Sequence, residues 1–600
     1  MFLPQVTDDN NTRAQIDTWY GYNHNFRANA GEFYDMENMS SDFFPLLSPR
    51  KLRPVLIEDE NIRGTLLYAG TLCYLAGQSF YYGDREVDLS DYISAEDTSL
   101  QQLVAYGAYI LIFPLGLCIN TADLTDVQAL DVSYTVTDGV TITYSLCDIN
   151  GTDLSATVSA SAPASPTDGE YWLNTTSGEA GLYIYDGAQG AWQPVPTVYL
   201  KITIPDAQLL QYFSAGDVVT LNTYLPDINN GSMIQALGND YMVVIGLMSS
   251  LTHTETTDNT WHLRIQRKVP ELDYVCADDN RVWGCHYGYD SSGNLVNEIY
   301  ASKLGDPKNW YVYQALATDS FAVSCGVPGR FTGCITYQGY PHFFKENAII
   351  KVYGNLPSEY QTYVTSCRGV QEGSYRSLAI VNEYLFYKSP SDVVVYDGSY
   401  PVSVSTALGR DRVFYDAVGG GTLNKYYISM EDAASNTYFF VFDTQYSIWE
   451  KEDSLRIQSF TAEENGQIYA ATSQKIYGIG ANENALFLNK KVSEEFVEWW
   501  CETADVGVDL PDYKMPRQFS IRAYVPIDSE IHIQISYDNQ PYDEIGTIRA
   551  TDEIVSRTFS FLPYRCDHYR LKFSGRGAVR IYSLTTTYEL ESEERNEYHI

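Results

Sequence analysis

The chain has 600 residues, a net charge of −38 and 51 tyrosines against 8 methionines. Because a single hydrophobic core stops growing near about 250–300 residues, we expect several structural units. The acidic balance argues against affinity for nucleic-acid phosphates, since such binding needs clustered Lys and Arg. A tunnel lined with negative charge would instead repel a DNA duplex and let it slide without sticking.

Membrane and disulfide-rich classes are not favoured either. No apolar run reaches the roughly 18 residues that a membrane-spanning helix needs, and the start MFLPQVTDDNNTR lacks the basic region and apolar core of a secretory signal. We therefore expect a soluble protein assembled in a cytoplasm. Ten scattered cysteines without a CxxC pair favour free thiols in strand cores over metal or disulfide sites.

Residues 1–64 are expected to form an extended N-terminal arm with a first strand. Pro45 and Pro49 exclude a helix through the second half of GEFYDMENMSSDFFPLLSPRKLR. Such arms either complete a sheet of their own domain or wrap a neighbouring subunit. The basic residues Arg50, Lys51 and Arg53 could pair with an acidic partner, although solvated charges beside a strand are the commoner explanation.

Pairs of tyrosine-rich strands recur along the chain. In 380–398, IVNEYLFYKSPSDVVVYDG, two runs of β-branched and aromatic residues flank a turn with Pro and Ser, which predicts a β-hairpin. Similar hairpins are expected at 66–84, 104–121, 274–302, 335–354, 427–451 and 459–480.

Repeated hairpins of this kind are typical of a β-propeller, whose four-stranded blades take about 40–50 residues each. We predict an all-β protein with a propeller of six or seven blades, its first part at 65–130 and its second at 272–489. The alternative is an irregular run of hairpins in stacked sandwiches.

Residues 131–271 interrupt the hairpins and are predicted to be an inserted β region. Its middle part, 168–195, carries Trp172 and Trp192 on short strands. Its last part, 198–268, favours a small β-barrel with one short helix near 207–213. Residues 490–600 are predicted to be a C-terminal β-sandwich of seven or eight strands, in which IHIQISY (531–537) points Ile531, Ile533, Ile535 and Tyr537 inward, followed by an acidic tail.

No constellation of residues indicates catalysis. The eight histidines are isolated, and no GxSxG elbow, HExxH helix or phosphate loop accompanies them. Neighbouring carboxylates such as Asp278 and Asp279 arise by chance in so acidic a chain, and 419–421, three glycines without the Lys and helix of a phosphate loop, predict a flexible turn between blades. We expect no enzyme, no cofactor and no metal.

Three stretches carry a resemblance to a known family. DDNRVWGC (278–285), NEIYASKLGDPKNWYVY (297–313) and GEFYDMENMSSDFFPLLSPR (31–50) are similar to segments of the tail nozzle proteins of tailed bacteriophages, also described as packaged-DNA stabilisation proteins. The resemblance covers about 1–125 and 272–480. The piece 168–195 also resembles small modules of phage tail and fibre proteins.

The resemblance implies a structural virion protein of a phage tail, assembled in the host cytoplasm. It implies a ring of copies, six by analogy with the family, that docks portal- or adaptor-side and distal tail proteins while viral DNA passes through without sequence-specific binding. The alternative is a receptor-binding or glycan-depolymerising tail protein, in which Trp172, Trp192 or propeller loops contact host surface glycan.

Overall fold

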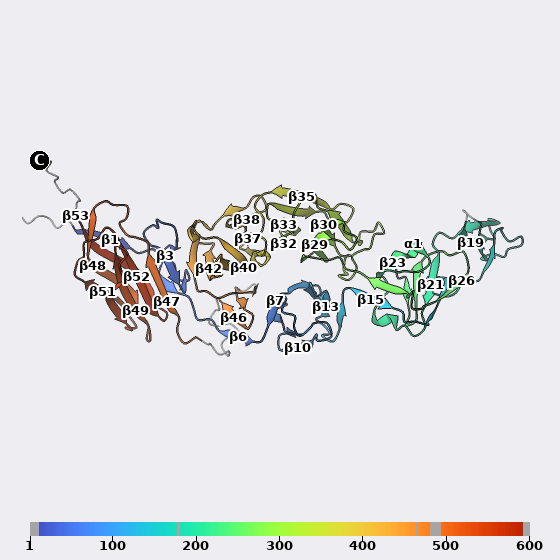
Figure 1. The fold of residues 1–600 in the computed structure, drawn as a ribbon, viewed down its shortest axis with the longest axis horizontal. Helices are drawn as coiled ribbons and strands as arrows, with labels where there is room; N and C mark the ends of the chain where they lie inside the picture. Colours follow the sequence, from blue (N-terminus) through green and yellow to red (C-terminus); the bar gives the residue numbers. More distant parts are fainter. Residues whose placement is uncertain (1–10, 177–179, 464–465, 480–493, 592–600) are drawn as a thin grey trace, which may run out of the picture. The chain divides into compact units, whose positions relative to one another are not determined.

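The computed structural model describes residues 11–176, 180–463, 466–479 and 494–591. These residues form 53 β-strands, one α-helix and three short 3-10 helices (Figure 1), which confirms the prediction of an all-β protein. No helix in the described ranges has the length and apolar character needed to cross a membrane. Most of the predicted acidic tail, residues 592–600, lies outside the described residues.

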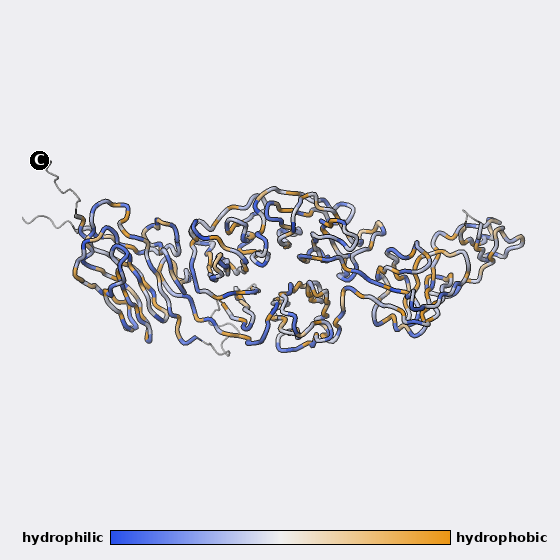
Figure 2. The backbone as a smooth tube through the Cα atoms, viewed as in Figure 1, coloured by the Kyte–Doolittle hydropathy of each residue, from blue (hydrophilic) through white to orange (hydrophobic). Residues whose placement is uncertain are grey.

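Apolar and polar positions are interspersed along the strands, with no long apolar run (Figure 2). Successive side chains of a strand point to opposite faces of its sheet. Residues 530–535 bury alternate positions, so one face packs and the other is partly exposed, whereas residues 468–471 are buried on both faces.

Among the described residues outside the insertion 131–271, seven four-stranded sheets are built from strands that follow one another in the chain, with one exception in the last sheet. The first two are β7 (Ile62–Tyr68) to β10 (Arg85–Asp88), through β8 (Thr71–Ala76) and β9 (Ser79–Tyr82), and β11 (Gln102–Tyr106) to β14 (Val127–Ala129), through β12 (Tyr109–Phe113) and β13 (Leu117–Asn120). The next two are β28 (Tyr274–Asp278), β29 (Arg281–Tyr289), β30 (Leu295–Ala301) and β31 (Phe321–Ser324), and β32 (Gly333–Tyr337), β33 (Tyr340–Lys345), β34 (Ala348–Tyr353) and β35 (Gln361–Ser366).

The remaining three sheets come from the last predicted hairpins. They are β36 (Ala379–Val381), β37 (Tyr384–Lys388), β38 (Val393–Tyr396) and β39 (Val402–Ser403); β40 (Phe414–Thr422), β41 (Lys425–Asp432), β42 (Thr437–Asp443) and β43 (Ile448–Lys451); and β44 (Ser459–Ala462), β45 (Ile468–Ala471) and β46 (Lys475–Ile479) with β6 (Val55–Glu58). Each of the seven predicted hairpins therefore lies within a four-stranded sheet of its own, the form expected of a propeller-like blade.

The last sheet joins two distant parts of the chain. Strand β6 pairs antiparallel with β46, so that Lys475 lies opposite Glu58 and Ile476 opposite Ile57. A strand from the N-terminal segment thus completes a sheet whose other strands come some 400 residues later.

The chain divides into two compact units, Met1–Gln102 with Phe343–Ile350 and Val364–Ile600, and Leu103–His342 with Lys351–Tyr363. In the first unit, the sheets β7–β10, β44–β46 with β6, β40–β43 and β36–β39 pack in that order, each against the next. Buried residues of β41, β42 and β45 share one core, which includes Phe439 and Ile468. Ile62 of β7, Tyr74 of β8 and Tyr469 of β45 belong to a second shared core.

The first unit also contains a four-stranded and a six-stranded sheet made by both ends of the chain. One is ordered β1 (Asn11–Ile16), β53 (Arg580–Glu591), β48 (Tyr513–Tyr524), β51 (Ile554–Ser560), and the other β2 (Gly21–Tyr22), β3 (Glu32–Glu37), β47 (Glu498–Thr503), β52 (Tyr569–Arg576), β49 (Glu530–Tyr537), β50 (Asp543–Arg549). Buried residues of both sheets share one core. The expected inward residues Ile531, Ile533, Ile535 and Tyr537 are buried there.

The N-terminal arm completes the sheets of its own unit. Strand β1 pairs along its whole length with β53, and β3 pairs with β47. The C-terminal β-sandwich predicted for 490–600 therefore also needs strands from residues 11–37. The described strands of the arm therefore complete sheets of their own unit, which is the first of the two roles expected for such an arm.

The three glycines at 419–421 correct the prediction of a flexible turn. They lie inside strand β40, opposite Ile428, Tyr427 and Tyr426. A Cβ on Gly420 would lie 2.3 Å from the Cβ of Phe460 in β44, and one on Gly421 would lie 2.1 Å from a methyl of Val381 in β36. Glycine is needed because neighbouring sheets approach this strand from both sides.

In the second unit, the sheets β11–β14 and β28–β31 share a core that includes Leu111, Phe113, Val282 and Trp310. The insertion between them forms two sheets around a second core. The sheets are ordered β15 (Val132–Thr135), β27 (Arg264–Arg267), β22 (Val218–Thr220), β23 (Asn230–Met233), and β24 (Ala236–Leu237), β25 (Tyr241–Ile245), β21 (Tyr199–Thr203), β16 (Thr141–Cys147), β26 (Thr252–Thr256).

These two open sheets replace the small β-barrel predicted for 198–268. Strand β16 supplies the centre of one sheet by pairing with β21 and β26, and β15 supplies the edge of the other by pairing with β27. Residues before 198 are thus part of the same body. The predicted helix near 207–213 is the 3-10 turn η1 (Leu209–Gln211), and the short helix α1 (Pro226–Asn229) was not expected.

A small third sheet of the insertion contains the predicted aromatic residues. It is ordered β17 (Ala156–Ser159), β18 (Tyr171–Asn174), β19 (Gly181–Asp186), β20 (Ala191–Pro194), with β17 and β18 parallel. Leu173 and Leu182 join the core of the insertion, which fixes this sheet to the two larger ones.

Candidate functional site

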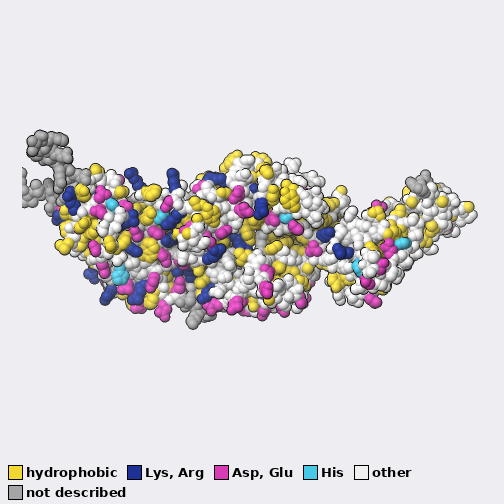
Figure 3. Space-filling model, in the orientation of Figure 1, with side chains coloured by type: hydrophobic (Ala, Val, Ile, Leu, Met, Phe, Trp, Pro, Cys, Tyr) yellow, Lys and Arg dark blue, Asp and Glu magenta, His cyan; other side chains and the backbone are white. Residues whose placement is uncertain are grey.

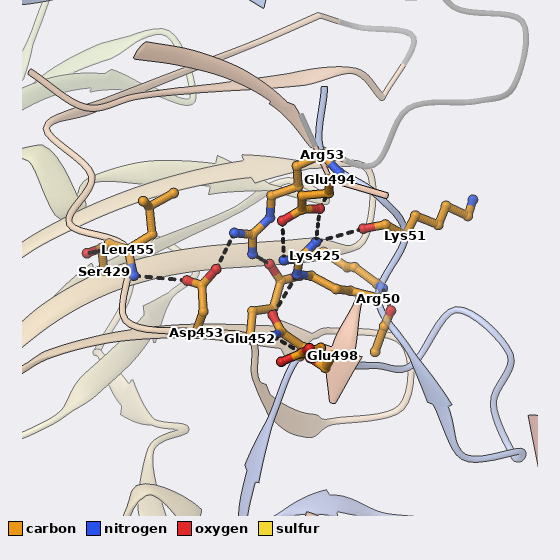
Figure 4. A network of polar contacts seen from close by, with 12 residues as sticks. Arg50, Lys51, Arg53, Lys425, Ser429, Glu452, Asp453, Leu455, Glu494 and Glu498 are labelled. Atoms are coloured by element: carbon orange, nitrogen blue, oxygen red, sulfur yellow. Dashed lines mark hydrogen bonds and ion pairs between the residues drawn. The ribbon is translucent and has the colours of Figure 1, made fainter. Parts of the chain in front are cut away.

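The basic residues singled out in the arm lie in a polar network in the first unit (Figure 4). Arg50 follows the short strand β5 (Ser48–Pro49). Its guanidinium donates two hydrogen bonds to the Glu494 carboxylate, at 2.8 and 2.9 Å, and a third to the side-chain oxygen of Asn38 at 2.7 Å. This two-pronged geometry is the strong form of an Arg–carboxylate contact.

Arg53 is buried more deeply. Its guanidinium contacts the carboxylate of Glu452 and donates to that of Asp453 at 2.5 Å, and it lies 5.0 Å from the centre of the Phe439 ring. Burial alone would lower the pKa of Arg53, but the two carboxylates raise it above its usual value. The side chain stays charged because these partners replace water.

The arm is fixed to the same neighbours by further contacts. The Lys425 ammonium donates to the Asp42 carboxylate at 2.5 Å, and the Ser41 hydroxyl donates to Asp443 at 2.7 Å. The Lys451 ammonium donates to Asp35 at 2.6 Å. These contacts tie residues 35–53 to the sheet β40–β43.

The placement of these residues corrects part of the prediction for Arg50, Lys51 and Arg53. The acidic partners of Arg50 and Arg53 lie in this chain, and only 8% and 4% of the two residues is exposed. Lys51 has an exposed side chain, 3.9 Å from Asp42. Arg50 and Arg53 therefore serve to fix the arm, because an external partner could not reach their charged groups.

The two predicted tryptophans meet in the small sheet of the insertion. The ring of Trp172 lies 5.1 Å from that of Tyr183 and 5.6 Å from that of Trp192, and the Trp192 and Tyr185 rings are 5.3 Å apart. Trp172 is buried, and its indole N–H donates to Ser159. Trp192 is half-buried at the edge strand β20. Only Trp192 of the two is placed to meet a ligand.

All ten cysteines are free thiols and nine of them are buried, as predicted. Burial raises the pKa of the thiols of Cys73 and Cys118 to about 12. Within residues 11–176, 180–463, 466–479 and 494–591, no group of three or more His, Cys, Asp or Glu side chains is arranged to hold a metal ion.

A groove that sequence reasoning missed lies on the six-stranded sheet of the first unit. It has a volume of about 740 Å³ and is lined mainly by side chains from β47, β49 and β52. Small-molecule sites usually measure about 300–1,000 Å³. The outward positions of the alternating strand 531–537, His532 and Gln534, contribute to it, and that alternation was the signal available in the sequence.

Comparisons with known proteins add little to this geometry. Neither a protein-family model nor a curated protein matches the chain. Solved structures to which it is similar include U3-55K, at 8% identity over 50% of this chain and 89% of that one, with a TM-score of 0.24.

Two further solved structures are an exo-beta-1,3-galactanase from Phanerochaete chrysosporium with galactose and the PorZ component of the type-IX secretion system of Porphyromonas gingivalis. The galactanase is 8% identical over 52% of this chain and 94% of its own, with a TM-score of 0.19. PorZ is 10% identical over 84% of this chain and 71% of its own, with a TM-score of 0.24. All three TM-scores are below 0.5, so these likenesses carry no argument about function.

Proposed function

We propose that this chain is a structural protein of a bacteriophage tail, a nozzle- or hub-like component of the conduit for DNA. The observation that carries the proposal is the way residues 31–58 link three parts of the first unit. Strand β3 pairs with β47 of the C-terminal sheets, residues 35–53 bond to the sheet β40–β43, and β6 completes the sheet β44–β46. One of the stretches that resemble nozzle proteins, 31–50, lies in this link.

A fixed link of this kind suits a part that must keep its shape under load. Both side chains of the Arg53–Glu452 pair are buried, and a buried pair that loses one partner is costly to the fold. The arm therefore holds the C-terminal sheets to the neighbouring sheet as one body.

The seven sheets are proposed to be the blades of a single β-propeller. The supporting feature is the last sheet, in which β6 joins β44–β46. A propeller must close into a ring of blades. When one strand of the last blade comes from the start of the chain, backbone hydrogen bonds within that blade hold the ring closed. The inserted body between β14 and β28 would then project from the propeller as a docking element.

Copies of the chain are proposed to form a ring, six by analogy with the family, docked to portal- or adaptor-side and distal tail proteins in the virion. A head-to-tail contact that closes gives such a ring. The net charge of −38 fits a lumen that repels DNA and lets it pass.

Electron microscopy of the purified protein, alone and mixed with the products of neighbouring genes, tests this proposal. A ring with a central opening, or stable attachment to a portal, adaptor or tail protein, is expected. Persistent monomers that attach to no other virion component would count decisively against it. The same genes give a cheap prior test, because a portal or adaptor gene is expected beside this one.

A receptor-binding role is the second candidate, because Trp192 is half-buried on the edge strand β20 and its ring lies 5.3 Å from that of Tyr185. Aromatic faces can stack on sugar rings, whose C–H groups meet the negative π face. If this role is correct, Trp192→Ala should abolish saturable binding to host envelope polysaccharide. Glycan release by the wild-type protein would extend the role to depolymerisation.

A further inference from the structure

The groove of about 740 Å³ lies on the outer face of the six-stranded sheet. Strand β47 contributes Glu498 and Trp500, strand β52 contributes Lys572, Ser574 and Arg576, and strand β49 contributes Glu530, His532 and Gln534. Within each strand these residues are two apart, so they share the face opposite the buried core. The floor of the groove is therefore a rigid sheet, and not a set of loops.

The charges of the groove compensate one another. It is lined by four carboxylates and three Lys or Arg side chains. The Arg576 guanidinium lies 3.2 Å from the Glu530 carboxylate, and that of Arg50 is held by Glu494 at 2.8 Å. On the face drawn in Figure 3, acidic and basic side chains are likewise interspersed over the C-terminal sheets. The groove therefore has no large excess of positive or negative charge that would attract a phosphate-rich ligand or a polycation.

Two aromatic rings flank this polar floor. Trp500 is half-buried. Its indole N–H donates to the Glu37 carboxylate at 3.0 Å, and the Lys572 and Lys451 ammonium groups lie 4.7 and 5.3 Å from its ring centre. Phe496 is 41% exposed at the rim, with the Arg576 guanidinium carbon 5.4 Å from its ring centre. The first contact fixes the Trp500 ring before any ligand arrives, which lowers the entropy cost of binding.

The remaining polar groups can donate and accept hydrogen bonds, and they do not require the ligand to be charged. Gln534 and Ser574 offer both donors and acceptors, and His532, whose ring nitrogen lies 3.1 Å from the Thr547 hydroxyl, offers a second ring nitrogen. Most of the lining residues are polar or charged, unlike the apolar pockets that hold the anchor residues of protein interfaces. A ligand that presents many hydroxyls and some apolar C–H faces fits it best.

We infer that this groove is a binding site for a neutral oligosaccharide, held by Phe496 and Trp500 and by hydrogen bonds from Gln534, Ser574 and Lys572. The site lies in the C-terminal sheets, apart from the Trp192 cluster of the insertion. It does not depend on the assembly role proposed above. It would give a tail component its own contact with a polysaccharide surface.

Calorimetry with the full chain and a panel of neutral oligosaccharides, containing hexoses or N-acetylhexosamines, tests the inference. At least one should bind saturably, and Trp500→Ala and Phe496→Ala should each weaken it by about tenfold. Trp192→Ala is the matched control and should leave this binding unchanged. A sulfated form of the same sugar should bind no more tightly.

Phe496→Ala and Gln534→Ala keep the test decisive if Trp500→Ala lowers the melting temperature, because both side chains lie on the surface of the groove. The inference fails if no neutral sugar binds, or if binding is unaffected by Phe496→Ala and Gln534→Ala. It also fails if binding is lost only with Trp192→Ala, or if the groove variants instead abolish capture of a peptide. The ring assay of the proposed function is independent of all these outcomes.

Discussion

The Arg53 guanidinium and the Glu452 carboxylate form a contact in which both side chains are buried, with exposed fractions of 4% and 7%. One residue lies in the N-terminal arm and the other follows strand β43, about 400 positions later. The pair therefore joins the arm to the sheet β40–β43 where water cannot replace either partner.

Removing Arg53 should be strongly destabilising. Arg53→Met leaves the Glu452 and Asp453 carboxylates without their cation, and losing one partner of a buried pair costs about 3–5 kcal/mol. Urea unfolding should show this loss. Lys51→Met, two positions away but exposed, is the matched control and should change the free energy of unfolding by no more than about 0.5 kcal/mol. Equal effects of the two substitutions would show that the pair is not important for stability.

The glycines of strand β40 give a second prediction. Gly420→Ala would place a Cβ 2.3 Å from that of Phe460, and overpacking of this kind costs about 1–3 kcal/mol. Thermal melting should show a lower transition temperature. Gly326→Ala is the control, because nothing lies within 4 Å of its added Cβ. If Gly420→Ala melts like the wild type, the two sheets do not approach as closely as described.

Glu450 gives a prediction for pH. Burial raises the pKa of its carboxyl from 4.5 to about 8, with Lys425 opposing and Asp443, Glu452 and Asp42 adding to the rise. Between these two pH values the unfolded chain releases a proton that the folded chain retains. The contribution of Glu450 to stability therefore falls as pH rises from about 4.5 to 8, by up to about 1.4 kcal/mol per pH unit.

Glu450→Gln should remove that dependence. The variant should gain stability relative to the wild type as pH rises from 5 to 8, measured by urea unfolding at each pH. Substituting the exposed Glu60 by Gln should leave the wild-type profile unchanged. Parallel profiles for Glu450→Gln and the wild type would mean that the carboxyl is ionised in the fold.

The C-terminal sheets should not fold without the arm. A fragment of residues 494–591 lacks β1 and β3, so the edges of β53 and β47 are unpaired, and exposed edges favour aggregation. Gel filtration and near-UV circular dichroism should show an aggregated or loosely packed species. Adding residues 11–58 through a flexible linker should restore a cooperative transition. A monodisperse, cooperatively melting fragment 494–591 would refute the prediction.

Local patterns in the sequence predicted the strands well. The alternation of 531–537 correctly gave the inward positions Ile531, Ile533 and Ile535, and the seven hairpins each correspond to one four-stranded sheet. Side chains alternate between the two faces of a strand, so the inward positions and the strands themselves can be predicted from neighbouring residues.

Pairings between distant segments could not be derived in this way. Nothing near Val55 indicates that β6 pairs with β46, and nothing near Arg50 indicates Glu494 as its partner. The error at Gly419–Gly421 has the same origin. Glycines inside a strand and glycines in a turn look alike in sequence until the neighbouring sheets are known.

The groove was missed for a related reason. Its polar residues were predicted to point away from the core, but three strands must lie side by side before such residues form a site. Strand order in a sheet depends on contacts between distant segments, so Trp500 and Gln534 had no reason to be considered together. The two residues lie far apart in the sequence, although both line the same groove in the folded chain.

We propose that the seven four-stranded sheets form one closed propeller within a ring-forming tail protein, and a cryo-electron microscopy map of the purified protein is the decisive measurement. Seven blades around one axis are expected, with β6 completing the blade of β44–β46, in subunits arranged as a ring. A map of isolated monomers whose sheets β7–β14 and β28–β46 share no common axis would contradict it.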